Sequence, residues 1–157
     1  LAAANGHPNA QLLLGNTMMS GLAGEYNPDK GYDWIRKAAE TGLVDAEIRL
    51  GDLFHYGVNG RPDHAEAVRW WMRAGEKSDA RAQLRLARAL ARGRGIERDY
   101  IEAYIFASLA AIQGNNYASE LRDELISRLR PEEIERAEQA LNAKIKPLTV
   151  TRGAGES

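Results

Sequence analysis

The chain has 157 residues, of which 44% are hydrophobic and 27% are charged, and both values are ordinary for a globular domain. The formal net charge of −1 supplies no positive field that would attract nucleic acid or an anionic membrane. No cysteine is present, which excludes disulfides, thiolate nucleophiles and cysteine-bearing zinc sites. No apolar run approaches the roughly 18 residues of a membrane span. We therefore expect neither nucleic acid as a partner nor a direct membrane span.

The same residue types recur every 36 positions along the chain. Each series holds one type or two similar ones: Gly6, Gly42 and Gly114 with Ser78 between them; Ala10, Ala46, Ala82 and Ala118; Leu14, Leu50 and Leu86; Trp34, Trp70 and Phe106. A fixed period of this length indicates stacked supersecondary units that bury their apolar faces against one another. We predict three repeats, at 6–41, 42–77 and 78–113.

The first residues of the chain are in phase with the repeats. Ala2 and Ala3 correspond to Ala38 and Ala39 one period later. Residues 1–5 are therefore predicted to be the end of a helix from a preceding repeat.

Each repeat is predicted to contain two helices. The first runs near 8–20, 44–56 and 80–92, and a glycine in the left-handed conformation ends it. Small residues at Gly15, Gly51 and Ala87 would let a neighbouring helix approach closely. The second runs near 30–41, 63–77 and 99–112.

The aromatic residues of the second helices are predicted to be mostly core. Trp34, Trp70 and Phe106 share one position of the period and are assigned to the buried face. Trp71 is expected to be only partly covered and is a candidate contact residue. Alternation with the period of a strand is absent, so the fold class is predicted to be all-α.

The segment after the third repeat departs from the pattern. Residues 114–146 are predicted to form a helical cap that covers the last repeat, with a helix that starts at Pro131 followed by Glu132 and Glu133. Residues 147–157 lack any period and are predicted to be a disordered tail.

The motif Ala46-x3-Leu50-Gly51-x2-Phe54-x2-Gly57 resembles the Sel1-like repeat, a relative of the tetratricopeptide repeat. The resemblance covers about residues 1–113. It implies a right-handed αα-solenoid and a role as an adaptor or regulator in a larger complex. The paired cysteines of one branch of that family are missing here, so the hydrolase-like activity attached to that branch is not carried over.

A partner-binding groove is the leading site hypothesis, because the resemblance implies that the first helices line the concave face. One stripe on these helices recurs in each repeat, at Asn9, Leu12 and Asn16; at Asp45, Ile48, Asp52 and His55; and at Arg81, Leu84, Arg88 and Arg92. Apolar residues in mid-stripe would give affinity and the charged flanks would set register. The alternative is that Leu12, Ile48 and Leu84 are core and that Asp52 pairs with Arg88.

No constellation of catalytic side chains is apparent, and we expect no enzyme activity and no cofactor. His7, His55 and His64 lack the spacing of metal ligands, so no metal site is predicted either.

The predicted function is a non-enzymatic protein–protein interaction scaffold whose partner is another protein. Arg81, Arg85, Arg88 and Arg92 form one helical stripe, which raises the alternative of acidic glycan recognition or support of a polysaccharide-export assembly. A solvated helix face would explain the same stripe. The resemblance to bacterial proteins, many of them exported, favours the periplasm or cell envelope, with the cytoplasm as the alternative.

Overall fold

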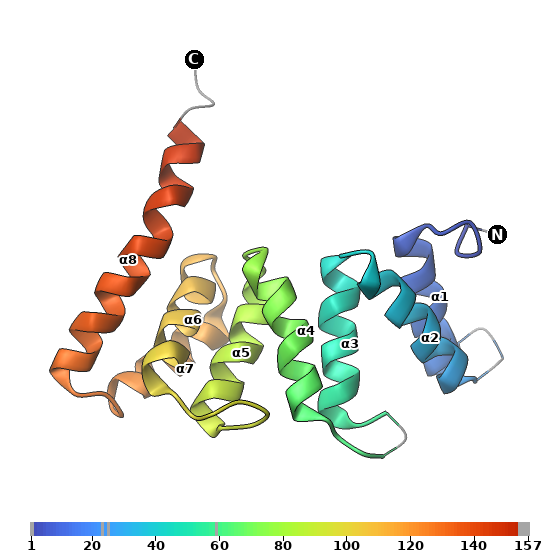
Figure 1. Cartoon of the computed structure of the whole chain (residues 1–157), viewed down its shortest axis with the longest axis horizontal. Helices are drawn as coiled ribbons and strands as arrows, with labels where there is room; N and C mark the ends of the chain where they lie inside the picture. The colour runs from blue at the N-terminus through green and yellow to red at the C-terminus, as the bar shows by residue number, and fades with distance from the viewer. Residues whose placement is uncertain (1, 23, 25, 59, 154–157) are drawn as a thin grey trace. The chain divides into compact units, whose positions relative to one another are not determined.

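The computed structural model describes residues 2–22, 24, 26–58 and 60–153, with 147–153 described by their backbone alone. Over these residues the fold is all-α, with no strand and one isolated antiparallel bridge between Val58 and Arg61. The helices are α1 (Pro8–Ser20), α2 (Pro28–Glu40), α3 (Val44–Tyr56), α4 (His64–Glu76), α5 (Ala80–Arg92), α6 (Tyr100–Ile112), α7 (Asn116–Ile126) and α8 (Pro131–Gly153) (Figure 1). The predicted class, an all-α repeat solenoid, is confirmed.

The chain divides into two compact units. The N-terminal unit is Leu1–Ala82 and the C-terminal unit is Gln83–Ser157. In the N-terminal unit α1 packs against α2, α2 against α3, and α3 against α4. In the C-terminal unit α6 packs against both α7 and α8. No helix in the described part of the chain is long and apolar enough to cross a membrane.

The paired helices of the N-terminal unit approach closely at glycines. A Cβ placed on Gly15 would lie 2.7 Å from the carbonyl oxygen of Gly31, and one placed on Gly31 would lie 2.8 Å from that of Gly15. A Cβ on Gly51 would lie 2.5 Å from the Trp71 ring. The predicted close approach at Gly15 and Gly51 is confirmed, because no side chain fits at either crossing.

Trp70 and Trp71 differ in burial from what was predicted. Trp71 is buried, with 4% of its surface exposed, so its interpretation as a partly covered contact residue is wrong. Trp70 is half-buried, packs on the core around Ile35 and lies under the Arg73 guanidinium, 4.7 Å from its ring centroid. Adjacent helical residues point about 100° apart, and the 36-residue period shows which positions are equivalent without showing which one faces inward.

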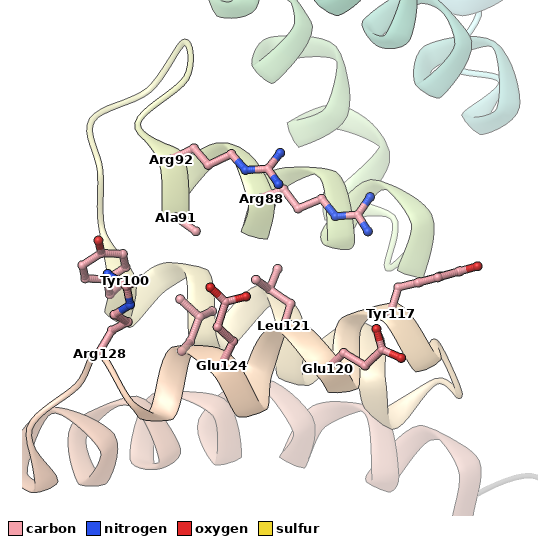
Figure 2. Close-up of a pocket in the computed structure, with 10 residues that line it drawn as sticks. Arg88, Ala91, Arg92, Tyr100, Tyr117, Glu120, Leu121, Glu124 and Arg128 are labelled. Atoms are coloured by element: carbon pink, nitrogen blue, oxygen red, sulfur yellow. The ribbon is translucent and has the colours of Figure 1, made fainter.

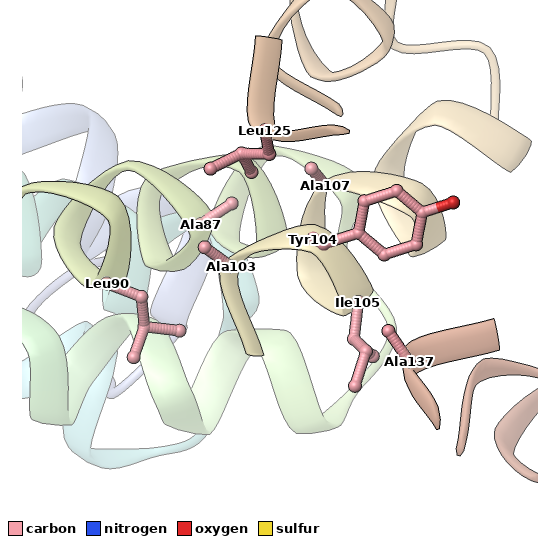
Figure 3. Close-up of a cluster of buried hydrophobic side chains, with 8 residues drawn as sticks. All are labelled: Ala87, Leu90, Ala103, Tyr104, Ile105, Ala107, Leu125 and Ala137. Carbon is pink, nitrogen blue, oxygen red and sulfur yellow. The ribbon is translucent and has the colours of Figure 1, made fainter. Parts of the chain in front are cut away.

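The core of the C-terminal unit, shown in Figure 3, contains side chains from α5, α6, α7 and α8. Its buried members are Ala87 and Leu90 from α5, Ala103, Tyr104, Ile105 and Ala107 from α6, Leu125 from α7, and Ala137 from α8. The last two helices thus bury apolar side chains against the helices of the third repeat, as a terminal element of a repeat array must.

Helix α8 begins at the predicted residue and extends further than expected. The backbone N–H of Arg130 donates to Glu133 Oε2 at 2.9 Å, the reciprocal half of a capping box. The Arg130 guanidinium, 2.9 Å from Oε1, lowers the pKa of Glu133 to about 2. The helix continues through Gly153, so residues 147–153 differ from the predicted tail, and residues 154–157 lie outside the described residues. Missing periodicity in a sequence does not exclude a helical backbone.

The second residue after the end of each second helix adopts a left-handed backbone. Gly42 has a φ of 90° and Gly114 a φ of 92°. Ser78 occupies the equivalent position with a φ of 65° and is the one residue with a side chain in this conformation among those described. Residues 2–7 repeat the same cap, because the Gly6 N–H donates to the Ala3 carbonyl as that of Gly42 does to Ala39.

We predict that Ser78→Gly stabilises the protein by about 1 kcal/mol. A left-handed backbone costs a residue with a Cβ about 1–2 kcal/mol, which glycine's greater freedom in the unfolded chain partly offsets. Gly114→Ser is the matched control and should destabilise by a similar amount, because nothing lies within 4 Å of its added Cβ and strain alone acts. Urea unfolding measures both, and a Ser78→Gly variant of unchanged stability would contradict the prediction.

A second prediction concerns the two tryptophans. Trp71→Ala should reduce the free energy of unfolding by about 3–5 kcal/mol, as truncations of buried aromatic residues do, and Trp70→Ala by clearly less. Trp71→Phe should cost about 1 kcal/mol for the lost indole hydrogen bond to Asp52 and the smaller ring. Thermal and urea unfolding of the three variants test this order, which an equal loss in both alanine variants would refute.

Candidate functional site

Most polar residues of the predicted stripe in the N-terminal unit bind other residues of the unit. Asn16 Oδ1 accepts a hydrogen bond from Arg49 Nε at 2.9 Å. Asp52 Oδ1 accepts from the Trp71 indole N–H at 3.1 Å. These groups hold neighbouring helices together before any partner is considered.

Asp45 and Arg81 form an ion pair between equivalent positions of successive repeats. The Arg81 Nη2 atom lies 2.6 Å from Asp45 Oδ1 and 2.8 Å from Asp79 Oδ2. Hydrogen bonds to the two carboxylates raise the pKa of Arg81. Asn9, at the corresponding position of α1, is exposed.

The burial of the apolar residues of the stripe favours the alternative in which they belong to the core. Ile48 is 5% exposed and packs with Ala74 and Ala82. Leu84 is 6% exposed, and Leu12 is half-buried against the cluster around Ile35. The sequence left this alternative open, because a residue at the edge of an apolar face can turn either way.

His55 lies in an aromatic group at the end of α3. Its ring centroid is 5.0 Å from Tyr56, 4.9 Å from His64 and 5.3 Å from Trp71. The described residues contain no group of three or more side chains suited to hold a metal ion. The arrangement is one of ring packing in which His55 stays half-exposed.

A buried polar residue recurs in each first helix, a feature that the sequence analysis missed. Gln11, Glu47 and Gln83 lie 36 residues apart and are all buried. Gln83 Oε1 accepts from Gln113 Nε2 at 2.9 Å. The 36-residue spacing of these three polar residues was the available signal.

Glu47 is the charged residue among these three buried polar residues. Its side chain is fully buried, and both carboxylate oxygens lie 2.8 Å from Lys77 Nζ. Arg73 Nε lies 3.2 Å from Oε1, and Lys77 Nζ also donates to the Gly42 carbonyl at 2.8 Å. Both cations reach solvent, with 40% and 46% of their side chains exposed.

The C-terminal unit contains a cleft between α5 and α7, which we call the α5–α7 cleft (Figure 2). Its volume is about 370 Å³, within the usual range of ligand pockets, roughly 300–1,000 Å³. The lining residues are Arg88, Ala91, Arg92, Tyr100, Tyr117, Glu120, Leu121, Glu124, Leu125 and Arg128.

The two walls of the cleft carry opposite charge. Arg88 and Arg92 project from α5, and Glu120 and Glu124 project from α7 on the other side (Figure 2). All four side chains belong to exposed residues. No ion pair or hydrogen bond joins the side chains of these four residues to each other or to other described residues. The cleft thus holds two rows of charge that are open to an incoming group.

The predicted stripe brings two of its residues, Arg88 and Arg92, to this cleft. The opposite wall comes from the segment that was predicted to be only a cap. Four residues of this segment nevertheless continue the stripe by one more period. Counted 36 residues on from Arg81, Leu84, Arg88 and Arg92, they are Tyr117, Glu120, Glu124 and Arg128. Extending the period into the cap would have found them.

The family model for the Sel1 repeat matches residues 8–43, 44–79 and 80–115. These ranges have the predicted period and begin two residues after each predicted repeat. Together they cover more than half of the chain.

The chain belongs to the Sel1 repeat family.

Solved structures agree with this assignment. The Sel1 repeat protein of Oxalobacter formigenes has a TM-score of 0.72 and 31% sequence identity, over 78% of this chain and 92% of that one. Cysteine rich protein B of Helicobacter pylori shares the fold, with a TM-score of 0.60 and 22% identity over 73% and 87% of the two chains. The protective antigen c5321 of uropathogenic Escherichia coli gives 0.55 and 21% over 99% and 50%.

One curated relative has a name that states its function. The alginate biosynthesis protein AlgK of Azotobacter vinelandii is 41% identical over 58 residues, which are 37% of this chain and 13% of that protein. This chain therefore matches a small part of that relative's length.

The buried polar position of this Sel1 protein yields a prediction by double-mutant cycle. Lys77→Gln should destabilise by about 3 kcal/mol, because it leaves the buried Glu47 carboxylate with fewer charged partners. Glu47→Gln should cost less, since the cations left behind reach water. The double variant reproduces the Gln83–Gln113 pair of the next repeat and should recover most of the loss seen in Lys77→Gln. Urea unfolding measures the cycle, and strictly additive losses would count against the pairing.

Proposed function

We propose that the chain is a non-enzymatic scaffold that binds a partner protein at the α5–α7 cleft and along the exposed part of the first helices. The observation that carries this proposal is the pair of exposed guanidinium groups, Arg88 and Arg92, that have no partner among the described residues and line a cleft. Exposed, unpaired arginines beside an apolar floor favour recognition of another molecule.

Membership of the family supports the same class of function. Sel1 repeat proteins generally mediate protein–protein interactions, and their fold is typically a non-enzymatic scaffold. Repeat arrays build extended binding surfaces from equivalent positions on successive units. Asn9, Asp45, Asp52 and His55 stay in the proposal as contact residues of the N-terminal unit, whereas Ile48 and Leu84 act through the core.

The alternative function is recognition of an acidic glycan, or support of a polysaccharide-export assembly. The match to a protein of alginate biosynthesis and the arginines of α5 favour it, because guanidinium groups bind carboxylates in pairs of hydrogen bonds. The same match favours the periplasm or cell envelope as the compartment, with the cytoplasm as the alternative. Fractionation of cells that express the tagged full-length protein tests the compartment.

Site-specific photo-crosslinking tests the scaffold proposal. Tyr117 in the cleft and Tyr26 between α1 and α2 are 67% and 69% exposed, so each can be replaced by a photoreactive phenylalanine with little change in packing. We expect a partner protein crosslinked from position 117 in cells, and we expect Arg88→Glu to remove that product. Position 26 is the matched control. Equal crosslinking from both positions, or a product insensitive to Arg88→Glu, would contradict binding at the cleft.

A further inference from the structure

We infer that the α5–α7 cleft takes an amphipathic peptide segment of mixed charge, acidic along one edge, apolar in the middle and basic along the other. This inference rests on the proposed scaffold function and specifies the chemistry of the partner. It follows from the two walls and the floor of the cleft.

The walls set the charges of the occupant. Arg88 and Arg92 lie one helical turn apart on α5, and Glu120 and Glu124 lie one turn apart on α7. Residues four apart lie on the same face of a helix, so each wall presents a pair of like charges. An acidic edge would meet α5 and a basic edge would meet α7.

The floor sets the apolar middle. Ala91, Leu121 and Leu125 line the cleft between the charged walls, and Leu121 points from α7 into the space beneath α5 (Figure 2). Leu125 is buried in the core of the unit, so the floor is held rigidly. An apolar side chain from a partner would be desolvated there, as the central contacts of interfaces are.

The carboxylates of α7 argue against a polyanionic chain as the occupant. With Arg128, the cleft residues include three arginines and two glutamates, so their net charge is only +1. A uniformly acidic glycan would bring its charges close to Glu120 and Glu124 as well as to the arginines. Like charges facing each other across an interface oppose association. A segment of mixed charge satisfies both walls at once.

The test measures binding of synthetic probes to the full chain by fluorescence anisotropy. Three labelled helical peptides of about four turns share one leucine stripe and differ at its edges: glutamate and lysine, glutamate on both, or lysine on both. An oligouronate is the fourth probe. We expect the mixed peptide to bind at least about tenfold more tightly than the other three, a difference of about 1.4 kcal/mol.

Charge reversal in the protein provides the control. Arg88→Glu and Glu124→Arg should each weaken the mixed peptide about tenfold or more. The quadruple variant, with Arg88→Glu, Arg92→Glu, Glu120→Arg and Glu124→Arg, again has two walls of opposite sign. It should recover binding, since the peptide can lie in the reverse direction. Arg136→Glu, an exposed reversal on α8 away from the cleft-lining residues, should have no effect.

The outcomes separate this inference from the proposed function. Tighter binding of the oligouronate or the all-glutamate peptide would overturn the mixed-charge inference and support the glycan alternative. A crosslinked partner at position 117, without preference for the mixed peptide or rescue by the quadruple variant, would retain the scaffold and overturn only the charge pattern. Circular dichroism confirms that each variant is folded.

Discussion

The close approach of the two helices in a repeat is the constraint on which the other features depend. At the first crossing neither Gly15 nor Gly31 has room for a Cβ, and at the second Gly51 lies against the Trp71 ring. Backbones this near fix the rotation of each helix about its axis, because a packed interface admits few alternative arrangements. That rotation decides which residues of the first helices turn inward and which stay available to a partner.

The repeat positions and helix ends could be predicted from the sequence with little error. The first helices were expected near 8–20, 44–56 and 80–92, and these are the bounds of α1, α3 and α5. Equivalent packing contacts demand equivalent residues, so the period of the sequence reports the period of the structure. Gly21 and Gly57, which were expected to end α1 and α3, follow these helices directly and have positive φ.

The direction of individual side chains could not be predicted in the same way. Trp70 and Trp71 are neighbours of equal character, and only the crossing at Gly51 shows that Trp71 is the buried one. Ile48 was expected in the groove, with the core as the alternative, and it is buried in the core. Periodicity establishes equivalence among repeats, whereas orientation depends on contacts made by residues distant in sequence.

Only some of the charged residues of the cleft could be predicted from the sequence. Arg88 and Arg92 fall within the clear repeats, but Glu120 and Glu124 lie in α7, where the apolar pattern shifts. Exposed charges leave no packing signature of their own. The last helices therefore serve two roles at once: Leu125 and Ala137 complete the core, and the opposite face of α7 forms a wall of the cleft.

The buried pairs also bear on how such an array can be rearranged by recombination. Glu47 and Lys77 lie 30 residues apart, as do Gln83 and Gln113, so both partners fit within one period. A gene rearrangement that duplicates, deletes or exchanges whole repeats at their junctions keeps both of these buried pairs intact. A breakpoint between residues 47 and 77 could join a buried carboxylate to glutamine, with a loss of stability comparable to that of a core mutation. The position of the pair thus favours exchange of repeats as complete modules over exchange of fragments.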